Sequence, residues 1–189
     1  MATGDYTVLD LELTGHVATI TLNRPERLNA LNTTLSLEFH NALDEVADNP
    51  DIRAVIITGA GRGFCSGADV GQMQNTLEGQ GQGPTPLQRS SGMPAGVSEL
   101  TPHLRRIPQP VIAAVNGVAA GGGLGVVLAS DIRVASEAAR FSCVFIRRSL
   151  VPDSSVSYTL PKLVGFGNAM EMALTGNVYD AQWALERAS

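Results

Sequence analysis

VIAAVNGVAAGGGLGVVLASDIRVAS, residues 111–136, is the stretch that decides the fold. It holds an apolar run at 111–115, a glycine-led apolar segment at 121–130 and a second short run, DIRVAS, at 131–136. Short uninterrupted apolar runs are typical of the buried strands of a parallel sheet, and the glycine-led segment is long enough for a buried helix. The stretch therefore predicts a strand–helix–strand unit.

The segments on either side continue this alternation. Apolar periodicity and glycine punctuation predict strands and helices along the whole chain. The expected strands are 6–13, 16–23, 51–58, 110–117 and 131–136, and the expected helices are 33–48, 97–107, 121–130, 158–165, 168–176 and 180–189. Residues 77–96, rich in Gly, Gln, Ser and Pro, predict a long mobile surface loop. We expect a single α/β domain over residues 1–189.

Composition excludes several classes of protein. The chain has 189 residues, 44% of them hydrophobic and 16% charged, with a net charge of −5. No basic stripe interleaved with aromatic residues is present, so we expect no nucleic-acid partner. No window reaches the length of a bilayer span and no basic-then-apolar leader begins the chain, so we expect a cytoplasmic protein without a membrane partner. Cys65 and Cys143 lack metal-ligand spacing, which predicts reduced thiols and no metal site.

Two glycine-containing turns carry the chemistry: GRGFCSGADV at 61–70 and NGVAAGGGLG at 116–125. Each follows an apolar strand and leads into a helix, so each presents unpaired backbone N–H groups that suit an anionic oxygen. Two such groups facing one point would form an oxyanion hole. The alternative is that Gly121, Gly122 and Gly123 only permit close packing of helix against strand. Neither turn is a P-loop or a dinucleotide fingerprint, and no GxSxG or HExxH motif occurs.

Taken together, these segments resemble one family closely. TLNRPERLNAL at 21–31, AVIITGAGRGFCSGADV at 54–70, the stretch at 111–136 and LPKLVGFGNAMEMALTG at 160–176 are similar to successive signatures of the enoyl-CoA hydratase/isomerase (crotonase) superfamily. The resemblance implies a spiral of ββα units. Family members continue into helices that complete the coenzyme A pocket and the trimer interface, so we expect a domain truncated at its C-terminus. It also implies a homo-oligomer, either a trimer or a dimer of trimers.

The resemblance assigns residues to an acyl-CoA substrate, of which coenzyme A is a part; we expect no separately bound cofactor. The amides of Ala68 and Gly122 would hold the thioester oxygen. The adenine and phosphates would lie near 24–28 and 67–70, which makes Arg24, Arg27, Leu28, Gly67, Ala68, Asp69 and Val70 the binding candidates. The arginines could equally be solvated loop charges, and Asp69 could cap its helix.

The sequence departs from the family at both catalytic glutamates of the hydratases. Gly125 and Phe145 stand at those positions, and neither side chain can transfer a proton. Asp153 remains, at a position where some isomerases and an aryl-CoA dehalogenase carry an acid that serves as base or nucleophile. Held in an apolar pocket, this carboxylate would be a better base. Its alternative role is to cap the following helix.

Three functions follow from these residues. The first is double-bond isomerisation of an enoyl-CoA with Asp153 as the proton shuttle, Ala68 and Gly122 as the oxyanion hole, and Phe145 helping to exclude water. The second is acyl-CoA binding with little or no turnover. Such a protein would still be named a hydratase from its sequence. The third is dehalogenase-like hydrolysis through Asp153 as a nucleophile. His16, His40 and His103 are interpreted as structural or solvated residues.

Overall fold

The computed structural model describes residues 6–71 and 96–188 of the chain. Its larger sheet has five strands in the order β1-β2-β3-β5-β7. They are β1 (Leu9–Thr14), β2 (Val17–Leu22), β3 (Ala54–Gly59), β5 (Val111–Val115) and β7 (Ile132–Ala135). The first two strands are antiparallel, and β2, β3, β5 and β7 are parallel neighbours. The parallel strands β3 and β5 alternate buried with half-buried residues.

A second sheet of short strands lies beside the first, in the order β4-β6-β8-β9. Its members are β4 (Gly63–Cys65), β6 (Val118–Ala120), β8 (Arg140–Ser142) and β9 (Val178–Asp180). Strands β3, β5 and β7 of the first sheet each lead directly to a strand of the second, so the chain spirals through repeated long-strand, short-strand units. The crotonase-type arrangement of ββα units is thereby confirmed.

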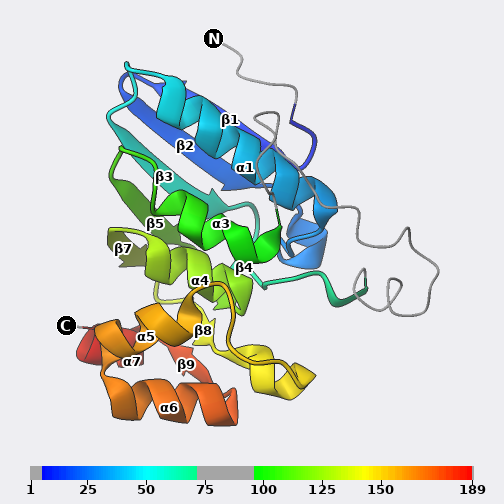
Figure 1. The fold of residues 1–189 in the computed structure, drawn as a ribbon, viewed down its shortest axis with the longest axis vertical. Coiled ribbons are helices and arrows are strands. Elements are labelled where there is room, and N and C mark those ends of the chain that lie inside the picture. The colour runs from blue at the N-terminus through cyan, green and yellow to red at the C-terminus, as the bar shows by residue number, and fades with distance from the viewer. Residues whose placement is uncertain (1–5, 72–95, 189) are drawn as a thin grey trace.

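Helices cover the large sheet and extend beyond it. The helical segments are η1 (Pro25–Arg27), α1 (Thr33–Asp48), α3 (Val97–Leu104), α4 (Gly122–Ala129), η2 (Val144–Arg148), α5 (Val156–Val164), α6 (Phe166–Thr175) and α7 (Ala181–Arg187). Helices α1, α3 and α4 lie along one face of the sheet, and α5, α6 and α7 gather with β9 near the C-terminus (Figure 1). All eight residues of α4 are buried, as a helix between two layers requires.

The predicted elements agree with the structure where apolar runs are long. The helix at 33–48 has the expected bounds, and Asn32 caps it by accepting a hydrogen bond from the Leu35 N–H at 2.8 Å. The strand expected at 51–58 begins three residues later, and the helix expected at 97–107 ends at Leu104. The short strands of the second sheet were missed as separate elements. The predicted loop at 77–96 lies outside the described residues except for Gly96.

Strand β7 forms an edge of the large sheet in the described part of the chain. Every residue of this strand is exposed, in contrast to its neighbour β5. Ile132 and Val134 are 52% and 60% exposed. Because alternate residues of a strand share a face, these two apolar side chains project on the same side.

Asn29 fixes the loop that joins β2 to α1. Its side chain is fully buried, and its backbone is left-handed, with φ 55°. The side-chain oxygen accepts from the Arg24 N–H at 2.8 Å, and the amide nitrogen donates to the carbonyls of Gly63 and Ala60 at 2.8 and 3.0 Å. A short polar side chain in this conformation therefore ties the loop to the turn before β4.

Replacing Asn29 with Asp tests this role. The change puts a carboxylate oxygen against carbonyl oxygens, and a buried acceptor without a donor costs about 1–3 kcal/mol or more for a charged group. We expect a lower free energy of unfolding in a urea titration. Asn23→Asp is the matched control, because Asn23 is exposed and its side-chain amide donates to the exposed Asp10 carboxylate and to no backbone carbonyl among the described residues. Equal loss in both variants would contradict the role of Asn29.

Candidate active site

The loop before α1 is hydrogen-bonded to the turn that carries Ala68. The Leu31 N–H donates to the Gly67 carbonyl at 2.7 Å, and the Asp69 N–H donates to the Leu31 carbonyl at 3.0 Å. These two bonds form a parallel bridge between Leu31 and Ala68. Successive amides of an extended chain point to opposite sides, so the Ala68 N–H faces away from Leu31. It donates to no backbone carbonyl among the described residues.

The second turn lies against the first at Gly67. The φ angle of Gly67 is 93°, and a Cβ atom there would lie 2.8 Å from the Ala120 carbonyl oxygen and 3.2 Å from the Gly122 nitrogen. Only glycine allows both the conformation and the close approach. The contact agrees with the topology, because β3 and β5 are parallel neighbours and their carboxyl ends share one edge.

Gly122 is the first residue of α4, where backbone N–H groups have no partner within the helix. The preceding amide, of Gly121, donates to the Ser142 carbonyl at 3.2 Å, whereas that of Gly122 has no backbone acceptor among the described residues. The structure therefore brings the two predicted amide donors onto adjoining turns. That both reach one thioester oxygen stays a prediction.

The packing interpretation of the glycines is right for Gly123. A Cβ atom at this position would lie 2.1 Å from the Cys65 carbonyl oxygen, so α4 can approach β4 only without a side chain. Cys65 is fully buried, and this burial raises the pKa of its thiol to about 12. Burial likewise raises the pKa of Cys143 to about 11. Both thiols stay protonated at neutral pH, so neither is a thiolate nucleophile.

Asp153 reaches this region through its neighbour Ser154. Ser154 is buried, and its hydroxyl lies 3.6 Å from the Cβ position of Gly122 and donates to the Asp153 carboxylate at 2.8 Å. The Asp153 side chain itself is exposed, so the expected apolar pocket around it is not present in the described structure. The predicted capping role also differs from the structure, because Ser155 is the N-cap of α5. Asp153 contributes to the start of α5 only through its backbone carbonyl, which accepts a hydrogen bond from the Val156 N–H at 2.8 Å.

Gly125 and Phe145, which stand in the hydratase glutamate positions, are both enclosed. A Cβ atom on Gly125 would lie 2.7 Å from the Ser154 carbonyl oxygen and 3.2 Å from a Thr101 methyl carbon. Phe145 is 5% exposed and belongs to the hydrophobic core. The chain around Ser154 thus fills the space that a side chain at position 125 would need.

The predicted coenzyme A contacts divide into two groups. The Arg24 guanidinium bonds the Asp69 carboxylate at 3.1 Å and the Ala30 carbonyl, with 12% of its side chain exposed. It is thus a clamp between the loop and the Ala68 turn, not a solvated loop charge. Arg27 and Val70 are exposed, and Leu28 is half-buried. Phosphate contact by either arginine stays a prediction, with Arg27 the more available cation.

Sequence reasoning missed four residues around the turns. Val97 of α3 lies 3.3 Å from the Cβ position of Gly122, and Thr101 one turn later donates its hydroxyl to Ser155 at 3.1 Å. Ser154 and Ser155 both have positive φ, of 48° and 60°. Paired serines after Pro152-Asp153 are a turn signal, but their left-handed conformation has no signature in the sequence.

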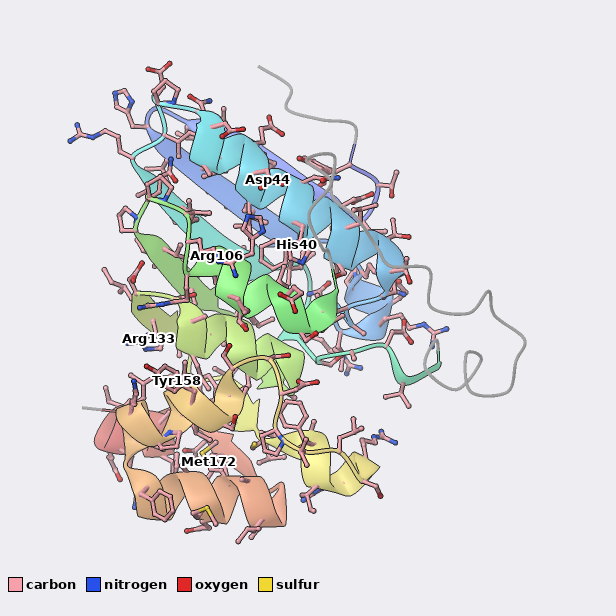
Figure 2. All side chains as sticks on the ribbon, in the orientation of Figure 1. His40, Asp44, Arg106, Arg133, Tyr158 and Met172 are labelled. Carbon is pink, nitrogen blue, oxygen red and sulfur yellow. The ribbon has the colours of Figure 1, made fainter. Side chains whose placement is uncertain are left out.

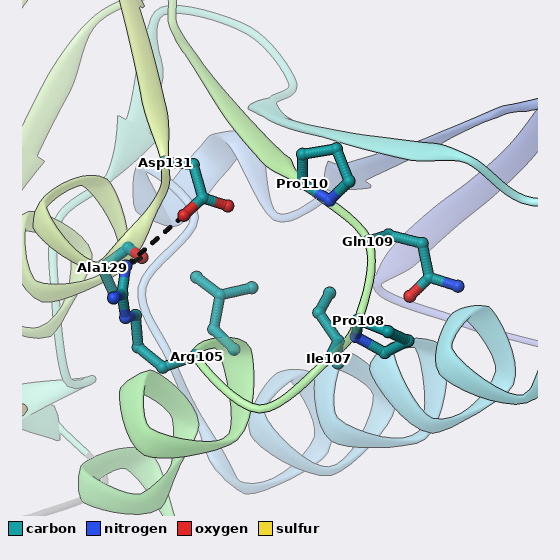
Figure 3. Close-up of a pocket in the computed structure, with 8 residues that line it drawn as sticks. Arg105, Ile107, Pro108, Gln109, Pro110, Ala129 and Asp131 are labelled. Carbon is teal, nitrogen blue, oxygen red and sulfur yellow. Dashed lines mark hydrogen bonds and ion pairs between the residues drawn. The ribbon is translucent and has the colours of Figure 1, made fainter.

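Two described cavities lie away from these residues. One of about 320 Å³ lies where α3 leads into β5 and is lined by Arg105, Gln109 and Asp131; the Arg105–Asp131 ion pair spans 3.4 Å (Figure 3). It lies at the amino end of β5, opposite to the glycine turn. The other, of about 820 Å³, lies among β7, α5 and α7. Neither is lined by Ala68, Gly122 or Asp153.

Two parallel-strand turns with adjoining backbone amides on a ββα spiral define a crotonase-type domain. The model of the enoyl-CoA hydratase/isomerase family matches residues 12–188. The chain belongs to the enoyl-CoA hydratase/isomerase family. None of the described helices is long and apolar enough to cross a membrane.

Relatives in this family carry both isomerase and hydratase names. The chain is 39% identical over 170 residues to the 1,2-epoxyphenylacetyl-CoA isomerase of Escherichia coli, which covers 90% of this chain and 63% of the relative. It is 42% identical to a probable enoyl-CoA hydratase of Mycobacterium bovis, over 89% of this chain and 59% of that one. A peroxisomal Delta(3,5)-Delta(2,4)-dienoyl-CoA isomerase of Arabidopsis thaliana is 36% identical, over 86% of this chain and 60% of that one.

Solved structures agree with the fold. The crystal structure of an enoyl-CoA hydratase from Mycobacterium avium subsp. paratuberculosis matches with a TM-score of 0.80 and 34% identity, covering 96% of this chain and 66% of that one. A structure from Geobacillus kaustophilus, also described as enoyl-CoA hydratase, matches with a TM-score of 0.82 and 31% identity, covering 97% and 67%. The chain spans about three fifths of the length of the curated relatives above.

Gly125→Ala tests whether position 125 can hold a side chain. The added carbon meets the carbonyl oxygen and the Cβ atom of Ser154, neither of which can rotate away, and overpacking of this kind costs about 1–3 kcal/mol. We expect the urea midpoint to fall. Gly167→Ala is the matched control, because Gly167 lies in α6 with open space at its Cβ position. Alanine at position 167 should leave the free energy of unfolding unchanged or raise it. A Gly125→Ala variant as stable as the unmodified protein would show that the backbone around Ser154 can move to admit a side chain.

Proposed function

We propose that this protein binds acyl-CoA thioesters and moves a double bond in an enoyl-CoA. The backbone amides of Ala68 and Gly122 hold the thioester oxygen, and the Asp153 carboxylate carries the proton. The observation that carries the proposal is the hydrogen bond from Ser154 to Asp153, since Ser154 is also beside Gly122. One buried hydroxyl therefore connects the candidate base with the candidate oxyanion hole.

The chemistry requires both parts. Removal of a proton from the carbon beside the thioester carbonyl leaves negative charge on the carbonyl oxygen. Fixed amide donors stabilise such charge by about 3 kcal/mol each, because they need no reorganisation during the reaction. Asp153 takes the proton and returns it at the far end of the shifted double bond. No water is consumed, so one carboxylate suffices.

The surroundings of Gly125 favour isomerisation over hydration. Hydration by the family route needs two carboxylates that hold one water, at the positions of Gly125 and Phe145. The Ser154 backbone fills the first position, and the second is a core phenylalanine. Asp153 directly precedes Ser154, so its carboxylate lies next to the segment that occupies the side-chain space of position 125.

The exposure of Asp153 favours a second candidate function. An exposed carboxylate lacks the apolar surroundings that strengthen a base. A protein with both amides in place and no effective base would bind acyl-CoA without turning it over. Substrate conversion and substrate binding therefore have to be measured separately.

Asp153→Asn separates the two functions. Asparagine keeps the shape and can still accept the Ser154 hydroxyl, but it cannot take a proton. We expect a 3-enoyl-CoA to be isomerised about 100 to 10,000 times more slowly, the usual cost of removing a general base. Affinity for a saturated acyl-CoA, measured by calorimetry, should stay within a few-fold of the unmodified protein.

Asp131→Asn is the control, because Asp131 is another exposed aspartate and lies far from Ser154, at the amino end of β5, where its carboxylate accepts from the Val111 N–H. Isomerase activity that survives Asp153→Asn would exclude Asp153 as the base. Efficient hydration of a 2-enoyl-CoA by the unmodified protein would exclude the mechanism. Binding without any turnover would establish the second candidate.

We also infer self-association, on the strength of the exposed face of α6. Phe166, Met170 and Leu174 recur every four residues and are 73%, 40% and 65% exposed, so they form one apolar stripe. Leu174→Lys should lower the mass measured by light scattering toward that of a single chain. The control Thr175→Lys changes the neighbouring exposed residue, and a mass unchanged by both would exclude α6 as the interface.

A further inference from the structure

A chain of hydrogen bonds buried between α1 and α3 has no part in the proposed chemistry. The Asp44 carboxylate lies 3.1 Å from His103 Nε2, and His103 Nδ1 lies 2.9 Å from His40 Nδ1. His40 Nε2 lies 3.1 Å from the Gly96 carbonyl oxygen. His40 is fully buried and His103 is 7% exposed. Asp44 and His40 lie on neighbouring turns of α1 (Figure 2).

Each of the three contacts needs one hydrogen. The Gly96 carbonyl only accepts, so His40 Nε2 carries a hydrogen. Between the two Nδ1 atoms one ring must donate, because two lone pairs at 2.9 Å repel each other. The contact between Asp44 and His103 needs a third hydrogen, on the ring or on the carboxyl group. A carboxylate and two neutral imidazoles hold only two hydrogens.

We propose that Asp44, His103 and His40 form a proton-binding site that holds one hydrogen more than these groups hold when separated. The extra hydrogen gives a His103 or His40 cation facing the Asp44 carboxylate, or a protonated Asp44 with two neutral rings. All three arrangements leave the group with no net charge, which suits its burial. Loss of the hydrogen breaks one link of the chain in each arrangement.

Among the described residues, Asp44 contacts the pair directly, through His103. The other charged groups on α1 and α3 near the pair are engaged elsewhere or exposed. Glu45 accepts from the Tyr6 hydroxyl at 2.9 Å, Arg105 pairs with Asp131, and Glu99 and Arg106 are exposed. The strands β2 and β3 beneath α1 contain no charged residue.

The proton-binding site holds the N-terminus of α3, the helix that packs against the glycine turn at 116–125. His40 holds the carbonyl of Gly96, which is the N-cap of α3. The same helix places Val97 against Gly122 and Thr101 against Gly125. The bound hydrogen therefore positions α3 over the candidate active site. This inference rests on the contacts between α1 and α3 alone, and it holds whether or not the proposed isomerisation is correct.

The pH dependence of stability tests the inference. Unfolded histidines lose their proton above their ordinary pKa of about 6.5. If the native protein keeps one more hydrogen, the equilibrium constant for folding falls as pH rises above about 7, and the fall approaches about tenfold per pH unit near pH 8. The measurement stays below about pH 8.5, where unfolded cysteines ionise and the buried thiols add a dependence of the same sign.

His103→Asn supplies the matched comparison. The asparagine amide can still donate to His40 Nδ1, but it binds no extra proton. We expect the tenfold dependence to disappear in this variant and to persist in His16→Gln, which changes the one histidine outside the site. His16 is exposed and bonded to the Asp51 carbonyl at 2.8 Å. Equal pH dependence in the unmodified protein and His103→Asn would overturn the proposal.

A second measurement uses the unmodified protein and so does not depend on the folding of a variant. Nuclear magnetic resonance of protein labelled with ¹⁵N in histidine reports which ring nitrogens carry hydrogen. At pH 8 we expect one slowly exchanging hydrogen between the Nδ1 atoms of His40 and His103. Two Nδ1 atoms without hydrogen at pH 8 would overturn the proposal.

Discussion

The approach of Gly67 to the backbone of Ala120 and Gly122 is the contact on which the site depends. It joins the end of one ββα unit to the start of the helix in the next. Hydrogen bonds hold the first turn from both sides, through Leu31 and through Asn116, whose side-chain amide donates to the Gly61 carbonyl at 3.0 Å. The two candidate amides lie on adjoining turns because the two sheets fix the turns that carry them.

How much the sequence predicts depends on how far a residue's partner lies along the chain. The apolar runs at 54–59 and 111–115 identify buried strands by composition alone. Three-residue strands such as Val118–Ala120 cannot be found in this way, because hydrogen bonds to distant strands define them. The glycine pattern located both turns and the family resemblance singled out Asp153, but neither could show that Asp153 is exposed or that Ser154 lies against Gly125.

The histidines illustrate the same limit. The interpretation of His40 and His103 as structural agrees with their burial, yet their contact joins residues 63 positions apart. Arg24 is a related case, because its partner Asp69 is 45 positions away. Its charge suggested a solvated loop residue and the family resemblance implied a phosphate contact, and neither expectation included the ion pair that the fold provides.

The exposed edge of β7 affects how the chain behaves in concentrated solution. An edge strand with apolar side chains is a template on which a strand from another molecule can add. Ile132 and Val134 supply the apolar surface, whereas Arg133 between them supplies a charge that opposes stacking of identical edges. The strand is also only four residues long, which limits the hydrogen bonds that any such addition can form. Aggregation through intermolecular β-structure is therefore weakest at low ionic strength, where repulsion between the Arg133 charges is least screened.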